Sequence, residues 1–185
     1  MTGRTHRCVR PIFALIFALR GLAKANDGRR AWALKMTLLD DIGTFRDRDL
    51  WLDLRAREPA NPLRGWVPAY RFAMRLDGVE HAVGRISFRV GSTHTIEQYA
   101  GHVGYEVAAA FRGQRLAERS CRLILPLARR HGFDTLWITC NPDNVASRRT
   151  CERLGAELVG IVDVPPDNDV YEPGGERKCR YRLAL

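Results

Sequence analysis

Polar and apolar residues alternate most regularly in the middle of the chain. Over residues 69–76 an apolar side chain stands at every second position, with two arginines and an alanine between. Asp77 and Gly78 follow, a pair typical of tight hairpin turns, and residues 82–90 alternate again. Such alternation buries one face of a strand. The pattern therefore predicts two antiparallel strands joined by a hairpin.

A third alternating segment, residues 102–109, precedes a change to helical spacing. Residues 111–115 read Phe-Arg-Gly-Gln-Arg and predict a turn. Over residues 116–131 apolar side chains recur three or four positions apart, and Gly132 is a typical helix terminator. Pro126 lies inside this segment, where it removes a backbone hydrogen bond at a cost of ~3 kcal/mol. We expect a helix that either kinks at Pro126 or packs tightly enough to accommodate it.

The carboxyl-terminal part predicts one parallel crossover and then a hairpin. Residues 135–140 (TLWITC) are a short, partly β-branched apolar run, and strand, helix, strand in this order favours a parallel pair. Residues 144–154 have helical spacing and end at Gly155. Residues 158–164 and 179–185 flank a loop rich in Pro, Asp, Asn and Gly. The predicted fold class is α+β, with a mixed, mostly antiparallel sheet flanked by helices.

The segment before these strands has no clear period. Residues 36–57 mix Leu and Trp with charged residues, so that Leu50, Leu52 and Leu54 stand among aspartates and arginines. We expect one or two short helices here.

Length and charge divide the chain into two parts. With 185 residues it can bury one sizeable core, so a single domain is expected. The formal net charge is +9, but the first 35 residues carry eight Lys or Arg residues against one acid, Asp27. The rest of the chain holds 22 basic and 20 acidic residues and is nearly neutral. No nucleic-acid partner is therefore expected, because such binding needs a basic face on the folded body.

The basic segment at residues 1–35 allows three interpretations. Its apolar run at residues 11–19 is shorter than the ~20 residues that span a bilayer, so stable membrane insertion is not expected. A secretory signal would need a small-residue cleavage site, and none is evident. We favour a start at Met36, or a disordered arm, over a basic interfacial anchor. Residues 36–185 are expected to form the functional domain.

The five cysteines and five histidines show no metal-ligand spacing. The sequence has neither a CxxC nor an HxxxH pair, so we expect no metal site. Reduced thiols are typical of a cytosolic compartment, and we expect a cytoplasmic protein.

The turn at residues 112–115 has the chemistry of a diphosphate site. At the start of a helix several N–H groups have no partner and lie at the positive end of the helix dipole. Arg112 and Arg115 add positive charge, and Gly113 lets the backbone approach a ligand. Taken alone, such a turn is more often a solvated loop.

The segment at residues 104–155 resembles the central motif of the GNAT (Gcn5-related N-acetyltransferase) superfamily. In that family a bulged strand leads into a (Gln/Arg)-x-x-Gly-x-(Gly/Ala) loop, a long helix, a buried strand and an Asn-led helix ending in Leu-Gly. Residues 112–117 (RGQRLA) match the loop, TLWITC matches the strand, and residues 141–155 match the last part. Arg115 departs from the pattern, since the family has its middle glycine there. The resemblance implies a twisted sheet that splays open at its centre beside the bulged strand.

The resemblance also implies where acetyl-CoA binds. Pantetheine would lie along residues 102–109 like an added strand, and the loop would hold the pyrophosphate. Asn144 and Ser147 resemble the family's polar contacts to the cofactor, with helix capping as the alternative role. The implied cofactor-binding residues are Val107, Ala108, Ala109, Arg112, Gly113, Gln114, Arg115, Leu116, Ala117, Asn144 and Ser147.

Two residues are candidates for proton transfer. In GNAT enzymes the amine attacks the thioester directly, so the amine's proton must be taken up. Glu106 is the candidate base because family bases are often carboxylates on this strand, and an exposed salt-bridge partner is the alternative role. Cys151 stands where the family often has a tyrosine that protonates the departing thiolate. Packing of a small buried cysteine is its alternative role.

The resemblance implies an enzyme that moves an acetyl group from acetyl-CoA to a primary amine. Because Arg115 and Cys151 depart from the family pattern, a non-catalytic CoA-binding or sensor module stays open. The acceptor also stays open, from small amines to a protein terminus, since the loops at residues 91–98 and 165–177 carry both signs of charge. A homodimer is neither indicated nor excluded by the sequence.

Overall fold

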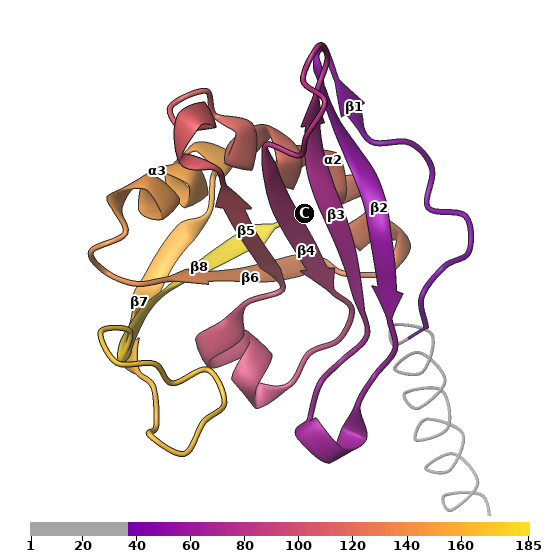
Figure 1. Ribbon diagram of the computed structural model, residues 1–185. Helices are drawn as coiled ribbons and strands as arrows, with labels where there is room; N and C mark the ends of the chain where they lie inside the picture. The colour runs from indigo at the N-terminus through magenta and orange to yellow at the C-terminus, as the bar shows by residue number, and fades with distance from the viewer. Residues whose placement is uncertain (1–36) are drawn as a thin grey trace, which may run out of the picture. The chain divides into compact units, whose positions relative to one another are not determined.

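The computed structural model describes residues 37–185, which lie within one compact unit, Lys35–Leu185 (Figure 1). The predicted amino-terminal extension, residues 1–35, lies outside the described residues. Among residues 37–185 no helix is both long enough and apolar enough to cross a membrane.

Eight strands form one mixed sheet in the spatial order β1-β2-β3-β4-β5-β6-β8-β7 (Figure 1). All neighbours are antiparallel except β5 and β6, which are parallel. The strands are β1 (Arg46–Asp47), β2 (Leu50–Glu58), β3 (Ala69–Leu76), β4 (Gly84–Arg89), β5 (Val103–Val107), β6 (Thr135–Cys140), β7 (Glu157–Asp163) and β8 (Arg177–Ala184). The predicted α+β class, with one parallel crossover and a final hairpin, is confirmed.

The first part of the sheet corrects one prediction. Residues 46–47 and 50–58 form strands, whereas short helices were expected over residues 36–57. Leu50 and Leu52 are buried and Leu54 is half-buried, with Trp51 and Asp53 between them, and β2 pairs with β3 along its length. Leucine favours helices intrinsically, but pairing with a neighbouring strand and burial of one face outweigh that preference.

The parallel strands β5 and β6 adjoin only at the beginning of β5, which lies beside the middle of β6. Val103 and Ile138 are their sole register partners, and the strands separate after this point. Just before β5 the chain comes very close to β6 at Gly101, which has a φ of 67°. A Cβ at Gly101 would lie 3.0 Å from the backbone of residues 137 and 139. The opening beyond Val103 is the splay that the family resemblance implies.

Two helices, α2 (Leu116–Arg130) and α3 (Val145–Leu154), pack on the sheet. Leu116 and Ile124 of α2 belong to the same buried cluster as Phe72 of β3, and α2 lies behind β3 and β4 in Figure 1. The helix continues through Pro126, so the proline is accommodated inside it. The other face of β2–β5 is covered by neither α2 nor α3.

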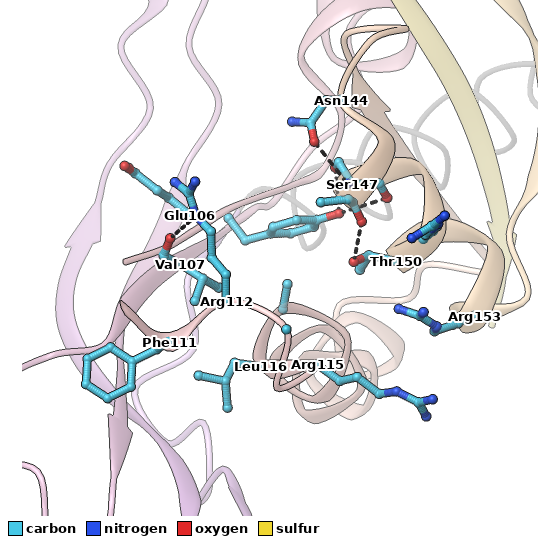
Figure 2. A pocket seen from close by; sticks show the side chains of 15 residues that line it. Glu106, Val107, Phe111, Arg112, Arg115, Leu116, Asn144, Ser147, Thr150 and Arg153 are labelled. Atoms are coloured by element: carbon cyan, nitrogen blue, oxygen red, sulfur yellow. Dashed lines mark hydrogen bonds between the residues drawn. The ribbon is translucent and has the colours of Figure 1, made fainter. Parts of the chain in front are cut away.

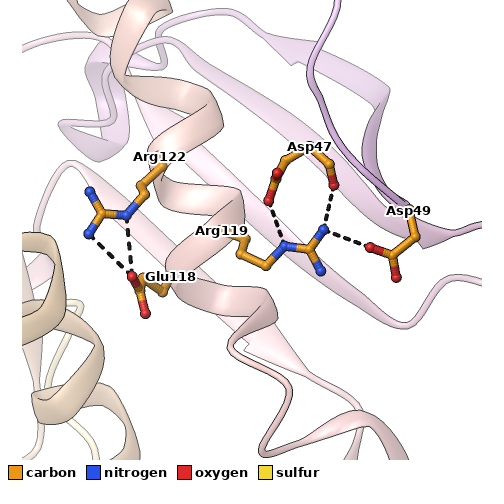
Figure 3. Close-up of polar contacts among 5 residues, drawn as sticks. All are labelled: Asp47, Asp49, Glu118, Arg119 and Arg122. Atoms are coloured by element: carbon orange, nitrogen blue, oxygen red, sulfur yellow. Dashed lines mark hydrogen bonds and ion pairs between the residues drawn. The ribbon is translucent and has the colours of Figure 1, made fainter.

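Hydrogen bonds fix the amino-terminal half of α2 (Figure 3). Arg119 donates to the Oδ2 atom of Asp47 at 2.6 Å and to the Oδ1 atom of Asp49 at 2.7 Å, which ties the helix to the β1–β2 turn. Arg122 donates to the carbonyl oxygen of Arg153, in the last turn of α3, at 2.6 Å. The beginning of α2 is therefore held beside α3 and the splay.

Candidate functional site

The splay leaves one edge of β5 open. Along an antiparallel pair, successive residues direct their N–H and C=O groups alternately toward the partner and away from it. The carbonyl of His102 and the N–H of Ala108 bond toward β4, at 2.8 and 2.9 Å. By this alternation the backbone groups of Tyr105 and Val107 point away from β4, into the splay. The strand thus offers backbone hydrogen-bonding groups at this edge.

The loop after β5 enters α2 without a side-chain cap. In the described part of the chain, the N–H groups of residues 113–118 have no hydrogen-bond acceptor, so they are available to a ligand. Gly113 has a φ of 85°, with open space where a Cβ would lie. Arg115 has a φ of 55°, a left-handed conformation that is uncommon without glycine. The departure from the family pattern therefore falls at a position whose backbone favours glycine.

The other side of the site comes from α3. Asn144 caps this helix, since its Oδ1 atom accepts the N–H of Ser147 at 3.0 Å. The capping role considered for Asn144 is thus present. Residues spaced three or four apart on a helix share one face, and one face of α3 lines the site with Ala146, Arg149, Thr150 and Arg153.

Together these parts enclose a groove of about 680 Å³ (Figure 2). The candidate residues that line it are Glu106, Val107, Arg112, Gly113, Arg115, Leu116, Ala117, Asn144 and Ser147. Four other candidates do not. Ala108 lines a separate hollow, Ala109 and Gln114 are exposed on the loop, and Cys151 is fully buried.

The groove is strongly basic. Arg112 and Arg115 come from the loop, and Arg149 and Arg153 come from α3. None of the four forms an ion pair with a carboxylate of residues 37–185. Arg112 donates to the carbonyl of Val107 at 3.1 Å, and Figure 2 shows the two residues side by side at the edge of β5. A ligand with several negative charges fits this set of residues.

Glu106 lies on the face of β5 that points away from the core. Its cross-strand partner is Arg85, and the two side chains form an ion pair at 2.5 Å. The Glu106 side chain is nevertheless 60% exposed. The salt-bridge role considered for Glu106 is therefore present, and its carboxylate is still accessible to a ligand.

Tyr105 contacts α3 across the groove. Its hydroxyl lies 2.8 Å from the Oγ atom of Ser147, and burial raises its pKa, so the hydroxyl keeps its proton. Cys151 has no exposed surface, and its hydrogen bond with Cys140, followed by burial, raises its pKa. Of these two side chains, only Tyr105 lines the groove.

Cys121, Cys140, Cys151 and Cys179 are free and buried. Within residues 37–185 no group of three His, Cys, Asp or Glu side chains is arranged to hold a metal ion.

Sequence reasoning missed several lining residues, among them Tyr105, Phe111 and the arginines of α3. A signal for α3 was available, because Arg149 and Arg153 are four positions apart and follow the candidate Asn144. For Tyr105 no such signal exists. Alternation predicts only that its side chain is half-buried, and its contact with Ser147 depends on where α3 crosses the splay.

A second cavity, which we call the sheet-face hollow, lies on the face of β2–β5 opposite α2 and measures about 700 Å³. Its lining includes four arginines, Arg55, Arg71, Arg85 and Arg89. Tyr105 and Glu106 line both the groove and the sheet-face hollow. A ligand in the groove and a ligand in the sheet-face hollow would therefore meet at these two residues of β5.

Comparison with protein families identifies residues 25–157 as an Acetyltransferase (GNAT) domain. A comparison with curated proteins finds no match.

Solved structures with a similar fold include several acetyltransferases. RimL, a ribosomal L7/L12 α-N-protein acetyltransferase in complex with coenzyme A, is 22% identical, with 66% of this chain and 64% of that chain covered and a TM-score of 0.50. Ribosomal-protein-S5-alanine acetyltransferase from Vibrio fischeri is 15% identical, with 63% and 61% covered and a TM-score of 0.50. The microcin C7 self immunity acetyltransferase MccE, in complex with acetyl-CoA and AMP, is 19% identical, with 63% and 61% covered and a TM-score of 0.48.

At these identities the likeness concerns the fold alone. The chain spans 61% to 64% of the length of these structures.

Proposed function

The chain belongs to the GNAT acetyltransferase family, and from this premise we propose that it binds acetyl-CoA in the groove and passes the acetyl group to a primary amine at β5. One observation carries the proposal. A single groove is surrounded by the N–H groups of residues 113–118, by four arginines and by the open edge of β5. Within residues 37–185 these N–H groups have no acceptor and the four arginines have no carboxylate partner. Coenzyme A carries phosphate groups and an arm with two amides, and these chemistries match the two parts of the groove.

The loop and α3 would hold the phosphates. The N–H groups from Gly113 to Ala117, which include those of Gln114 and Leu116, face the diphosphate in this proposal, and Arg112 adds a charge-assisted hydrogen bond. Arg149 and Arg153, one helical turn apart, would supply further positive charge. Pantetheine would follow residues 105–109, where its amides could pair with the open edge of β5.

The reaction needs one proton acceptor and one proton donor. The amine nitrogen attacks the thioester carbonyl carbon, a C–N bond forms, and the C–S bond breaks. We propose that Glu106 accepts the amine's proton, directly or through a water molecule, because this carboxylate lies where the two cavities meet. Its ion pair with Arg85 would hold the carboxylate in place.

The departing CoA thiolate must take up a proton. Cys151 has the sequence position for this role, but its thiol is buried and lines neither cavity. We therefore propose the Tyr105 hydroxyl as the donor, with Ser147 orienting it through their hydrogen bond.

The first test is binding and turnover by the full chain. Acetyl-CoA is expected to raise the melting temperature, since a ligand that binds only the folded state stabilises it. Arg112→Glu should reduce this shift, because it places a carboxylate beside the phosphates, while Arg129→Glu, at the far end of α2, should not. The absence of a shift at millimolar CoA would contradict the proposed site.

A second candidate function is CoA binding without turnover. It is favoured by the burial of Cys151, which removes the candidate acid from the groove. Release of free CoA on addition of amines, followed with a thiol reagent, distinguishes the two. Binding without amine-dependent CoA release would establish the binding module instead.

A further inference from the structure

Arg89 occupies an unusual position in the sheet-face hollow. Its Nη1 atom donates to the carbonyl oxygens of Ala100 and Gly101, at 3.3 and 3.1 Å. The guanidinium lies over Gly104 of β5, where an added Cβ would be 3.5 Å from Nη1. Arg89 therefore lies within van der Waals reach of Gly104, on the strand at which the two cavities meet.

Charge pairing separates Arg89 from the other arginines of the sheet-face hollow. Arg71 pairs with Glu58, Arg85 with Glu106 and Arg55 with Asp53, at 2.8, 2.5 and 3.0 Å respectively. Within the described part of the chain, Arg89 has no carboxylate partner.

Partial burial also makes the charged form of Arg89 energetically unfavourable. Its side chain is half-buried, and burial, followed by the nearby charge of Arg71, lowers its pKa. The charges of Glu58 and Asp169 act in the opposite direction, but Glu58 is paired with Arg71 and Asp169 accepts a hydrogen bond from Trp66. A bound anion would stabilise the partly buried charge of Arg89 further.

The hydrogen bonds of Arg89 indicate which anion fits. Nη1 is occupied by the two carbonyls, and Nε and Nη2 make no hydrogen bond within residues 37–185. These two atoms form one edge of the guanidinium plane, and two parallel N–H donors match the two oxygens of a carboxylate.

We propose that the amine acceptor carries a carboxylate, which binds Arg89 in the sheet-face hollow while the amine lies at Glu106. This inference rests on the proposed acetyl transfer and adds the class of its acceptor. Gly104, under Arg89, and Glu106 are two residues apart on β5, a separation of ~7 Å at 3.3–3.4 Å per residue. An amine and a carboxylate separated by a short carbon chain span this distance.

Three matched amines test the inference with the unmodified full chain. They are 4-aminobutyrate, butylamine and 1,4-diaminobutane, which have similar lengths and carry an anionic, a neutral and a cationic group at the far end. With acetyl-CoA saturating, kcat/KM for 4-aminobutyrate is expected to exceed that for butylamine by about 10- to 100-fold, the range of a charge-assisted hydrogen bond, and 1,4-diaminobutane should be the poorest acceptor. Equal values for the three amines, or a preference for the diamine, would overturn the inference.

Substitutions identify the residue responsible. Arg89→Met keeps most of the side-chain volume but removes the charge, and it should abolish the difference between 4-aminobutyrate and butylamine. Arg89→Lys should retain part of it. Arg75→Met is the matched control, because Arg75 lies on β3 and outside the lining of the sheet-face hollow, so the preference should persist.

Persistence of the full preference for 4-aminobutyrate in Arg89→Met would overturn the assignment of Arg89 as the carboxylate-binding residue. If Arg89→Met does not fold, the ranking of the three amines by the unmodified chain still decides the inference.

A further pair of acceptors distinguishes a free amino acid from a peptide amino terminus. The dipeptides Ala-Glu-amide and Ala-Gln-amide differ only in the carboxylate near their terminal amine. If the acceptor is a peptide, the acidic member is expected to react faster by the same factor, whereas a free amino acid acceptor predicts poor turnover of both. Faster turnover of Ala-Gln-amide would contradict the inference. If no amine or peptide releases CoA although CoA binds, the proposed acetyl transfer fails, and the acceptor inference fails with it.

Discussion

In the groove, the N–H groups of residues 113–118 stand beside arginines from a loop and a helix, whereas the sheet-face hollow is lined mainly by side chains on strands. Backbone groups at a helix start are positioned by the fold and do not depend on which side chains are present. Arg115, where the family pattern has glycine, accordingly has a left-handed backbone with a φ of 55°. Side chains on a strand can be exchanged without altering the backbone, so recognition in the hollow can change with few substitutions.

The two cavities also differ in charge pairing. The four arginines of the groove have no carboxylate partners among the described residues, while in the hollow only Arg89 lacks one. The groove is thus suited to a ligand with several negative charges, and the hollow to a ligand with one. Four experiments test this difference between the cavities.

The largest effect is expected from reversing charge in the groove. Arg149→Glu combined with Arg153→Glu should raise the Kd for CoA by roughly 100-fold, because charge-assisted contacts contribute ~1.5–3 kcal/mol each. Arg55→Glu, in the sheet-face hollow, should leave this Kd nearly unchanged. Isothermal titration calorimetry gives both values. Equal weakening by the two changes would mean that CoA binding depends on overall charge and that the cavities are not distinct.

The next effect concerns His102, the residue immediately before β5 and next to the pairing of β5 with β6. Its Nδ1 atom accepts the N–H of Trp137 at 2.9 Å, and its side chain is 1% exposed. Burial, followed by the charge of Arg89, lowers its pKa from 6.5 to about 4. Between these values the folded protein binds fewer protons than the unfolded chain, so this contribution to stability is complete above pH 6.5 and is lost as the pH falls toward 4.

For His102 alone, the free energy of unfolding should fall by about 2 kcal/mol between about pH 7.5 and pH 5. Urea unfolding at both values measures the change. His102→Gln should lose less stability over the same interval, since His131, whose pKa is also lowered, still titrates in both proteins. The same pH dependence in the two proteins would show that the neutral form of His102 does not contribute to the stability of the folded protein.

A smaller effect distinguishes the two proton-donor candidates. Tyr105→Phe should lower kcat by about 10-fold, less than the usual 100-fold or more for a general acid, because a CoA thiolate is a tolerable leaving group. The KM for acetyl-CoA should change little. Cys151→Ala should keep kcat and lose only packing, seen as a lower melting temperature. A large loss of kcat in Cys151→Ala, with Tyr105→Phe unaffected, would reverse the assignment.

The smallest effects are expected in the loop itself. Gly113→Ala should lower the free energy of unfolding by about 1 kcal/mol, because φ is 85° although a Cβ meets no atom. Arg115→Gly should change it by less, since relief of the left-handed conformation offsets the greater flexibility of glycine in the unfolded chain. Thermal unfolding of both variants measures the difference. A large stabilisation by Arg115→Gly would show that the strain at Arg115 is greater than its φ of 55° suggests.

The regular elements around the site could be predicted from local patterns. β3 and β6 occupy the predicted residues 69–76 and 135–140, and α2 ends within one residue of its predicted terminus. Each of these segments has a clear hydrophobic period and a turn residue or glycine at its end. β2 was predicted wrongly, because its leucines suggested a helix while their spacing of two indicated a strand.

The fold class, the loop at residues 112–115 and the acetyltransferase family could be inferred from sequence, because they depend on residues close together in the chain. Which side chains share a cavity depends on the three-dimensional packing of the elements. Tyr105 and Ser147 are 42 positions apart, and their contact exists because α3 crosses the open edge of β5. In the same way, Arg89 lies on Gly104 through the register of β4 and β5. Contacts between distant segments are set by the packing of whole elements, and no local pattern in the sequence contains them.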